Sequence, residues 1–231
     1  MVDRVVTTRD INAAIRRQLE KSKVVKIGDS EKGGLTGQDS IAVGLEAESE
    51  IIVAGDAGDY FGAFNNGAII NLTGTAGRFL GDSMKNGGII VKGRVRHGVG
   101  VYMAGGIIVI KGGVEGEVGQ YNSGGTVIVN GKTGDGVGSY MNSGTIIITG
   151  KAGKNVGNWL LGGEIFIGSE PESIGENAKQ TVLDDEDIEK LQKYFEHYGI
   201  IYDNLDAYVK IIPIDDNPFR LGKSISGGAT I

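Results

Sequence analysis

Short runs of alternating apolar residues recur along the middle of the chain, and they repeat every 19 residues. In chain order, their apolar pairs are Ile51/Val53, Ile70/Leu72, Ile89/Val91, Ile108/Ile110, Val127/Val129, Ile146/Ile148 and Ile165/Ile167. Alternation of β-branched residues with period two is typical of a strand with one buried face. The pattern therefore predicts one such strand in each 19-residue unit.

Two further columns of large side chains share this period. The first is aliphatic apart from one phenylalanine and holds Phe61, Leu80, Val99, Val118, Val137 and Val156. The second follows three residues later and holds Phe64, Ser83, Tyr102, Tyr121, Tyr140 and Trp159, so that serine interrupts a run of aromatic residues. We expect each unit to contain two short strands joined by bends.

Glycine marks the same period and makes up 41 of the 231 residues. One column holds Gly62, Gly81, Gly100, Gly119, Gly138 and Gly157, and another holds Gly55, Gly74, Gly93, Gly112, Gly131 and Gly150. A third holds Ala68, Gly87, Gly106, Gly125, Gly144 and Gly163. Because sharp bends need a positive φ, which glycine adopts at little cost, all three columns are expected at corners.

A unit of this kind cannot bury its own apolar face and must stack on its neighbours. The sequence therefore predicts an all-β fold, a right-handed parallel β-helix of about six or seven turns over residues 40–168. A left-handed hexapeptide helix is rejected because the apolar positions do not recur every six residues. Calcium-binding nonapeptide repeats are rejected because both the period and the repeated aspartate are missing.

The two ends of the repeat are expected to carry short capping helices. Residues 8–21 have an apolar stripe, preceded by Thr7 and Asp10 at capping-box spacing. A second helix is expected after Asp184, and residues 207–212 suggest one more strand. The organisation is thus an N-terminal capping segment (1–39), the β-helix (40–168), and a C-terminal helix, strand and tail (169–231). The tail beyond Pro213 is expected to be extended or dependent on a partner.

Composition and charge narrow the class of protein. The chain has no cysteine, which excludes disulfides, thiolate-bound metals and a cysteine nucleophile. A net charge of -6, with acidic and basic residues interspersed, does not favour nucleic-acid binding. No stretch has the length of a membrane span, and the first residues lack the apolar core of a signal peptide. We expect a soluble cytoplasmic protein that binds neither membrane nor nucleic acid.

Two Gly-Asp-Ser runs, at residues 28–30 and 81–83, resemble the start of some esterase motifs. The second lies inside a repeat unit whose other copies carry tyrosine in place of Ser83, so this serine is interpreted as a turn residue. No complete G-x-S-x-G elbow occurs, and only His97 and His197 could serve as a base. These observations do not favour a serine hydrolase.

Other candidate motifs are also better explained by the repeat. The run Gly131-Lys132-Thr133 resembles the end of a phosphate loop, but its spacing is wrong and no helix follows. His97 shares its column with Asp59 and Asp135, which suggests a solvated corner. Those two aspartates stand four turns apart, about 19 Å, so they do not form the carboxylate pair that glycoside cleavage needs. The tyrosine column and the methionines Met84, Met103 and Met141 favour stacked ladders over a ligand site. The sequence predicts no catalytic, cofactor-binding or metal-binding residue.

Several runs resemble the GXGXG domain that closes the large subunit of glutamate synthase and also occurs as a separate polypeptide. They are Gly55-Asp-Ala-Gly58-Asp-Tyr-Phe-Gly62, Gly74-Thr-Ala-Gly77-Arg-Phe-Leu-Gly81 and Gly87-Gly-Ile-Ile-Val-Lys-Gly93. Gln38-Asp-Ser-Ile-Ala-Val-Gly-Leu45 and Tyr208-Val-Lys-Ile-Ile-Pro213 resemble the flanking segments of that domain. The resemblance spans residues 8–213.

The resemblance implies a noncatalytic scaffold subunit of a glutamate-synthase-type complex. In such complexes a glutaminase domain uses an N-terminal cysteine, and a synthase barrel binds FMN and an iron–sulfur cluster. The expected partners are therefore a glutaminase chain and an FMN-binding synthase chain, and the expected pathway is glutamate biosynthesis in nitrogen metabolism. Self-association of the isolated chain stays open.

Two alternatives accompany this interpretation. Similar β-helices form a subunit of formylmethanofuran dehydrogenase, a molybdenum or tungsten enzyme, and related chains accompany N-methylglutamate synthase. The second alternative is a stand-alone hydrolase or ligand-binding β-helix, which would require activity of the chain alone that depends on Ser83 or His97.

Overall fold

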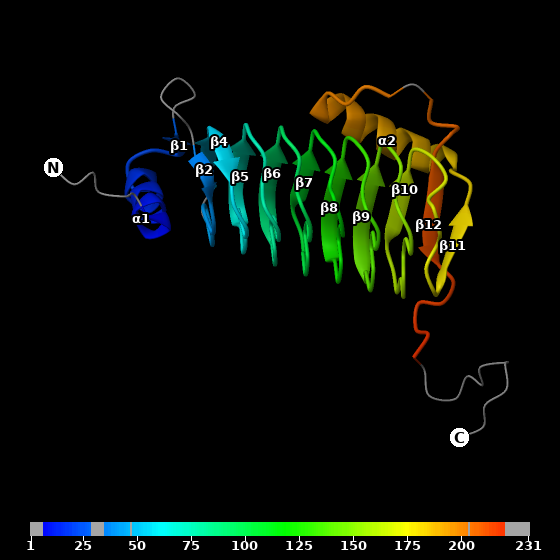
Figure 1. The fold of residues 1–231 in the computed structure, drawn as a ribbon. Coiled ribbons are helices and arrows are strands. Elements are labelled where there is room, and N and C mark those ends of the chain that lie inside the picture. The colour runs from blue at the N-terminus through cyan, green and yellow to red at the C-terminus, as the bar shows by residue number, and fades with distance from the viewer. Residues whose placement is uncertain (1–6, 29–34, 47, 203, 220–231) are drawn as a thin grey trace.

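The chain forms a right-handed parallel β-solenoid of about seven turns (Figure 1), in a computed structural model that describes residues 7–28, 35–46, 48–202 and 204–219. The predicted fold class is confirmed, whereas the limits of the three segments stay a prediction. The elements are α1 Thr8–Leu19, β1 Val24–Ile27, β2 Leu35–Gln38, β3 Glu50–Val53, β4 Gly55–Ala57, β5 Asn66–Leu72, β6 Asn86–Val91, β7 Ile107–Ile110, β8 Ser123–Val129, β9 Ser143–Ile148, β10 Glu164–Ile167, β11 Ala178–Thr181, α2 Asp185–Tyr198 and β12 Val209–Pro213.

One long sheet runs the length of the solenoid. Its ten strands follow the order β1-β3-β5-β6-β7-β8-β9-β10-β12-β11, and strands β1 to β10 of this sheet are parallel. Ile70 pairs with Ile89, and Ile89 pairs with Ile108, so the register equals the 19-residue repeat. The predicted apolar pairs therefore form the strands of this sheet.

The second strand expected in each unit is largely absent from the described residues. Only β2 and β4 form a second, two-stranded sheet. Elsewhere the corresponding positions make isolated bridges, such as Val95 with Val114 and Val99 with Val118. Corner residues with positive φ follow at short intervals, for example Gly98 and Gly100, and leave too few extended residues for a strand.

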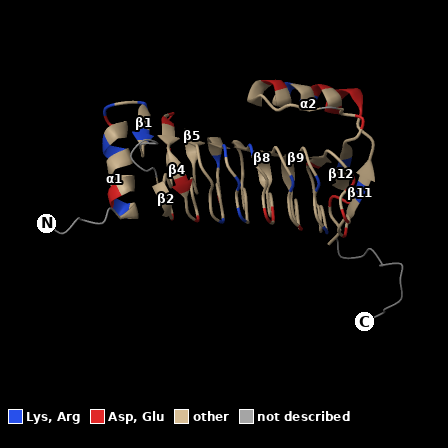
Figure 2. Cartoon of the chain, turned by 45° about the horizontal axis from the view of Figure 1, so that its top comes forward, with Lys and Arg blue, Asp and Glu red and all other residues tan. Residues whose placement is uncertain are grey.

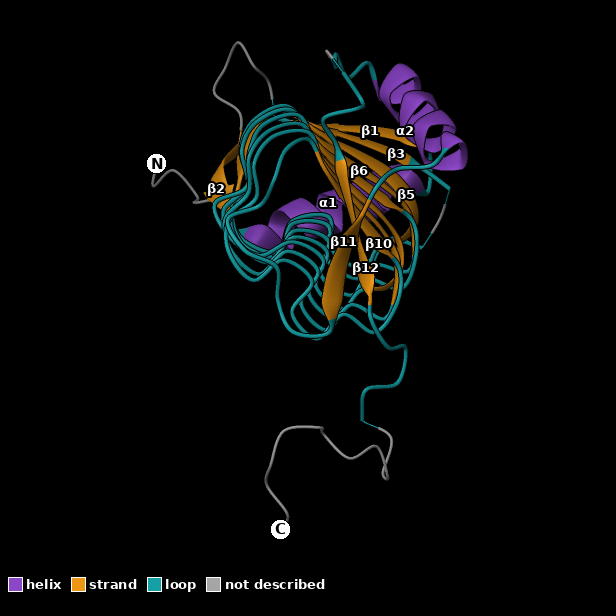
Figure 3. Cartoon of the chain, turned by 90° about the vertical axis from the view of Figure 1, so that its right-hand side faces the viewer, coloured by secondary structure: helices purple, strands orange, loops and turns teal. Residues whose placement is uncertain are grey.

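Figure 3 views the coils from the C-terminal end of the solenoid. Their interior is filled by a continuous stack of apolar columns. The strand pairs and the column from Phe61 to Val156 are buried, as expected. The predicted methionine ladder also lies inside, because Met84, Met103 and Met141 have no exposed side-chain area. Like residues thus pack on like residues in successive coils, a coil being one turn of the solenoid.

The glycine columns serve two different purposes. In the column from Gly62 to Gly157 every φ lies between 61° and 68°, as expected for corners. The glycines of the third column, from Gly87 to Gly163, also have a positive φ. In the second column the expectation holds for Gly55, with a φ of 102°, but it is wrong for Gly93 and three others, which have no positive φ. A Cβ on Gly93 would lie 2.5 Å from the carbonyl oxygen of Gly74, so this column needs glycine because successive coils approach closely.

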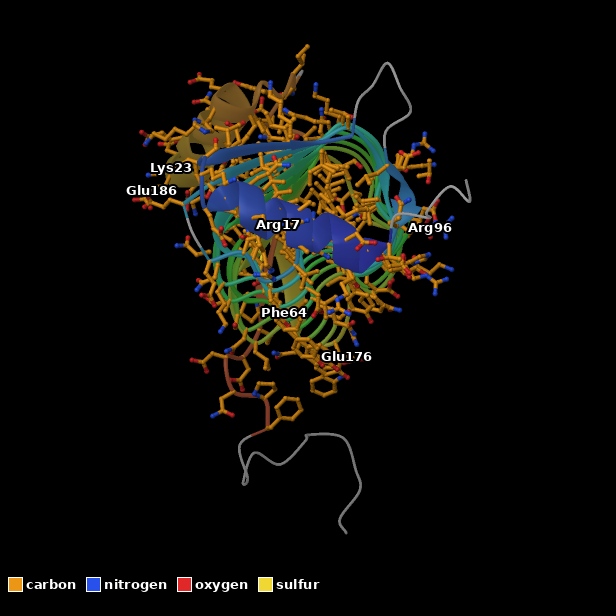
Figure 4. All side chains as sticks on the ribbon, turned by 90° about the vertical axis from the view of Figure 1, so that its left-hand side faces the viewer. Arg17, Lys23, Phe64, Arg96, Glu176 and Glu186 are labelled. Atoms are coloured by element: carbon orange, nitrogen blue, oxygen red, sulfur yellow. The ribbon has the colours of Figure 1, made fainter. Side chains whose placement is uncertain are left out.

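Helix α1 covers the first coil, as predicted (Figure 4). Its N-cap is Thr7, which forms the expected capping box with Asp10. Ile11 and Ile15 are buried against the solenoid interior. The Asn12 side chain donates to the Ser40 carbonyl at 2.7 Å and accepts from the Ala42 N–H at 2.9 Å, so the helix satisfies backbone groups of the first coil.

Helix α2 forms where expected but does not cover the end of the solenoid. It starts at the N-cap Asp184 and ends at Gly199, which has a φ of 58°. It lies along the outer face of the sheet over the C-terminal coils (Figure 1), where it buries Leu191 and Phe195. The expectation that this helix caps the end of the solenoid is therefore wrong. The helix lies along the side because the outer face carries an apolar column, which holds Val109, Ile128, Ile147 and Phe166.

The end of the solenoid is closed by a strand that runs in the opposite direction. The strand expected at residues 207–212 is β12, which inserts between β10 and β11 and is antiparallel to both. Part of the predicted tail, residues 220–231, lies outside the described residues.

Candidate functional site

The residues considered for hydrolysis do not lie together, because Ser83 and His97 occupy different coils and His197 belongs to α2. The Ser83 hydroxyl donates to Asp82 Oδ2 at 3.1 Å. His97 instead faces two glutamates, with Nε2 3.9 Å from Glu115 and Nδ1 3.5 Å from Glu117. His197 belongs to α2, where its ring packs edge-on against Tyr198. Of the other Gly-Asp-Ser run, residues 29 and 30 lie outside the described residues.

The run Gly131-Lys132-Thr133 is a contact between coils. The Lys132 carbonyl accepts from the Val114 N–H at 2.9 Å, and the Thr133 N–H donates to the Lys151 carbonyl at 2.9 Å. The Thr133 N–H, which a phosphate loop would turn toward its ligand, is therefore engaged with the next coil.

Aspartates on the N-terminal coils bind the backbone of the next coil. Asp39 accepts from the N–H of Asp59, whose own carboxylate accepts from the N–H of Arg78 at 2.7 Å. Asp135 accepts in the same way from the Lys154 N–H. The backbone hydrogen bond from Thr75, aided by its hydroxyl, holds the pKa of Asp56 below its ordinary value. Asp39, Asp56 and Asp59 line a polar cleft near β2 and β4, but each is already engaged in joining coils.

Within the part of the chain that the structure describes, no three histidine, aspartate or glutamate side chains gather to hold a metal ion. Across the same residues, neither helix combines the length and apolar character needed to cross a membrane.

The aromatic column forms a ladder on the outside of the solenoid. We call Phe64, Tyr102, Tyr121, Tyr140 and Trp159 the aromatic ladder. Tyr102 and Tyr121 stack with their ring centroids 4.9 Å apart, and Tyr121 and Tyr140 stack at 5.2 Å. Figure 4 shows Phe64 on the side of the solenoid away from Glu186 of α2. The ladder confirms the stacking expected from the repeat.

Every member of this column, Ser83 included, has a φ between 54° and 57°. Bulky residues rarely adopt this conformation, which costs about 1–3 kcal/mol for each residue and persists only where the surrounding structure enforces it. No sequence pattern indicates this conformation, because aromatic residues are not typical of left-handed backbone. The coil geometry thus holds the outward rings in a fixed orientation.

An ion-pair network joins α2 to the end of the sheet. Lys210 of β12 lies 2.6 Å from Asp187 and 3.3 Å from Glu164, and Lys190 lies 2.6 Å from Glu164. Burial alone would raise the pKa of Glu164, but the two lysines outweigh it and hold this pKa below its ordinary value. Acidic residues gather at the N-terminal end of α2 (Figure 2), where the helix dipole favours them.

Further polar side chains lie where α2 meets the sheet. Lys111 donates to the carbonyl of Tyr198, and burial lowers the pKa of this lysine. Burial raises the pKa of Tyr208 to about 12. The hydroxyls of Thr126 and Tyr194 lie 3.0 Å apart and tie α2 to β8. These contacts fix the helix on the sheet. They join residues far apart in the sequence, so motif patterns for catalytic sites do not reveal them.

The comparison with protein families agrees with this architecture. Residues 7–211 match the family model of the GXGXG motif, a range that includes α1, the whole solenoid and most of β12. A comparison with curated proteins finds no match. Since the family match extends over most of the chain, the protein belongs to the GXGXG motif family.

Proposed function

We propose that this chain is a noncatalytic scaffold subunit of a glutamate-synthase-type complex. The observation that carries the proposal is the GXGXG family match over residues 7–211, together with the resemblance of its repeat units to the domain that braces glutamate synthase. The partners would be a glutaminase chain and an FMN-binding synthase chain. The complex would make glutamate from 2-oxoglutarate, glutamine and reductant in the cytoplasm.

The geometry supports a bracing role. Seven strands of the long sheet, from β3 to β10, are hydrogen-bonded in an unbroken parallel series. The corner aspartates add side-chain bonds from coil to coil, such as Asp59 to the Arg78 N–H. A body joined in this way keeps its surface points at fixed distances, which suits a subunit that positions two catalytic partners.

The chemistry would belong to the partners. The glutaminase step needs a cysteine nucleophile, and the iron–sulfur cluster needs thiolate ligands. This chain contains no cysteine and could supply neither. When bound to the synthase partner, FMN would carry the reducing electrons, while this chain would orient the partners around it.

Mass spectrometry of proteins that co-purify with the chain from its native cell at low salt tests the proposal. Recovery of a glutaminase chain and an FMN-binding chain would support it. Recovery of a molybdopterin subunit would replace it with the formylmethanofuran dehydrogenase alternative. A chain that purifies alone would contradict the scaffold role.

A reconstitution assay tests the bracing role itself. The partner chains are assayed for glutamine hydrolysis and for glutamate formation with and without this chain. We expect the chain to raise the ratio of glutamate formed to glutamine hydrolysed. An unchanged ratio would show that the chain does not couple the two reactions.

A further inference from the structure

The aromatic ladder has one position without a ring. Ser83 stands between Phe64 and Tyr102 in the column and shares their left-handed backbone, with φ 55° beside 57° and 54°. Stacked neighbours elsewhere in the ladder are 4.9 Å and 5.2 Å apart. Two coil spacings separate Phe64 from Tyr102, or about 10 Å, so one planar group fits between them. We call this opening the Ser83 gap.

Exposure shows that the rings beside the gap are uncovered. Tyr102 is 57% exposed and Phe64 is 53% exposed, whereas Tyr121, which has a ring on each side, is 38% exposed. An open aromatic face attracts planar groups and cations. The gap thus presents two such faces at a fixed separation.

A carboxylate stands at the base of the gap. Asp82 Oδ2 lies 3.1 Å from the Ser83 hydroxyl. The ion pairs found among the described residues do not include Asp82, although Lys85 follows three positions later. Burial raises the pKa of Asp82 above its ordinary value, so a cation beside it would stabilise its charged form.

The column already receives a planar side chain from outside the coils. Phe219, which follows β12, stacks on Trp159 with ring centroids 5.2 Å apart and 23° between the ring planes. A segment that is not part of a coil can therefore place a flat group in line with this column.

We propose that the Ser83 gap binds the guanidinium group of an arginine side chain from a partner protein. A guanidinium is planar and cationic, stacks on aromatic faces and donates to a carboxylate. Midway in the gap it would lie about 5 Å from each ring, within the range of a cation–π contact. A lysine ammonium lacks the plane, and an uncharged ring would leave the carboxylate without a cation. The inference rests on the proposed scaffold function for the source of the arginine.

The gap itself is tested on the full chain with the peptide acetyl-Gly-Arg-Gly-amide. Proton NMR follows the arginine side-chain protons, which the rings should shift upfield. The control peptide carries citrulline, which is planar but uncharged. We expect millimolar binding of the arginine peptide, and binding of the citrulline peptide weaker by about fivefold or more. Equal binding of both peptides, or no upfield shift, would overturn the proposal.

Three variants separate the parts of the gap. Ser83→Tyr fills it with the residue that the column carries elsewhere, and it should abolish the shift while the chain stays folded. Asp82→Asn should weaken arginine binding by about fivefold or more and leave citrulline binding unchanged. Tyr121→Ser opens a matched gap beside Gln120, which has no charge, and should add no second arginine site. Arginine binding that survives Ser83→Tyr would overturn the proposal, whatever the other variants do.

Co-purification then separates this inference from the scaffold function. Ser83→Tyr in the full chain should reduce recovery of the partner about tenfold at a salt concentration at which the natural chain retains it. Full recovery with this variant would show that the partner does not use the gap. If the natural chain recovers no partner, the scaffold function fails, while the peptide result still decides whether the gap binds arginine.

Discussion

Lys210 and Asp187 lie 2.6 Å apart, and this contact joins the reversed strand β12 to the first turn of α2. The Asp187 side chain is 3% exposed and also accepts from the Asp184 N–H in the capping box. One carboxylate thus fixes both the start of the helix and its position on the sheet.

Replacement of Asp187 by alanine should lower the free energy of unfolding by about 2–4 kcal/mol, because it removes the box and leaves Lys210 with Glu164 alone. Denaturant unfolding measures the loss. Asp185→Ala, in the same turn but exposed, is the control and should change stability by about 0.5 kcal/mol or less. Similar losses for both variants would show that neither the capping box nor the contact with Lys210 adds to stability.

Glu164 should make the protein sensitive to acid. Because its pKa is depressed in the folded state, its contribution to stability is present above its ordinary value of 4.5 and is lost as the pH falls through the folded-state pKa. Thermal unfolding between pH 6 and pH 3 would show a steeper loss for the natural chain than for Glu164→Gln. Parallel curves for the two proteins would contradict this assignment.

Two glycines with similar φ separate backbone strain from crowding. Gly199 has a φ of 58° with open space around it, whereas Gly119 has a φ of 66° and faces the side chain of Ile146. Gly199→Ala should cost about 1 kcal/mol, from strain alone. Gly119→Ala should cost about 2–4 kcal/mol, since the Cβ must also displace a core side chain. Equal values in denaturant unfolding would mean that the core yields without cost.

Two interior asparagines offer a matched test of buried polar groups. The Asn65 side chain accepts from the Ala68 N–H at 3.1 Å and donates to the Ala68 carbonyl at 2.8 Å. Asn122 accepts from the Gly124 N–H at 3.0 Å, but its Nδ2 has no partner among the described residues. Asn65→Leu should therefore cost about 3 kcal/mol and Asn122→Leu about 1 kcal/mol. The reverse order would show that Asn122 has a partner in solution.

The 19-residue repeat could be predicted because it is imposed on every unit by the same contacts. Ile70, Ile89 and Ile108 recur at the strand register, and only a stack of equal coils buries all of them. Thr7 and Asp184 predicted the helix starts, because a capping residue bonds to the backbone of its own first turn and does not depend on the rest of the fold.

The position of α2 could not be inferred from its own apolar stripe. The stripe of a helix shows that it packs, but not against which surface. The informative signal lay in another part of the chain, in the outward column, which is apolar without interruption from Ile90 to Phe166 after the polar Asn71. That column marks the coils that need a cover.

The left-handed aromatic column lay beyond sequence reasoning for a different reason. Neither Tyr102 nor Tyr121 favours a positive φ by itself. The conformation is set by the coil as a whole, which places an identical corner at the same point in each turn. Properties of this kind appear only once the coils are assembled.

The reversed direction of β12 has a consequence for assembly. A parallel coil of a second molecule has no matching register at the end where β12 and β11 are antiparallel, and α1 occupies the other end. A second molecule thus cannot continue the parallel series at this end, because the strand that it would meet there is the antiparallel edge strand β11. Each additional parallel coil would instead have to be inserted within the repeat, where it would lengthen the solenoid by about 4.8 Å.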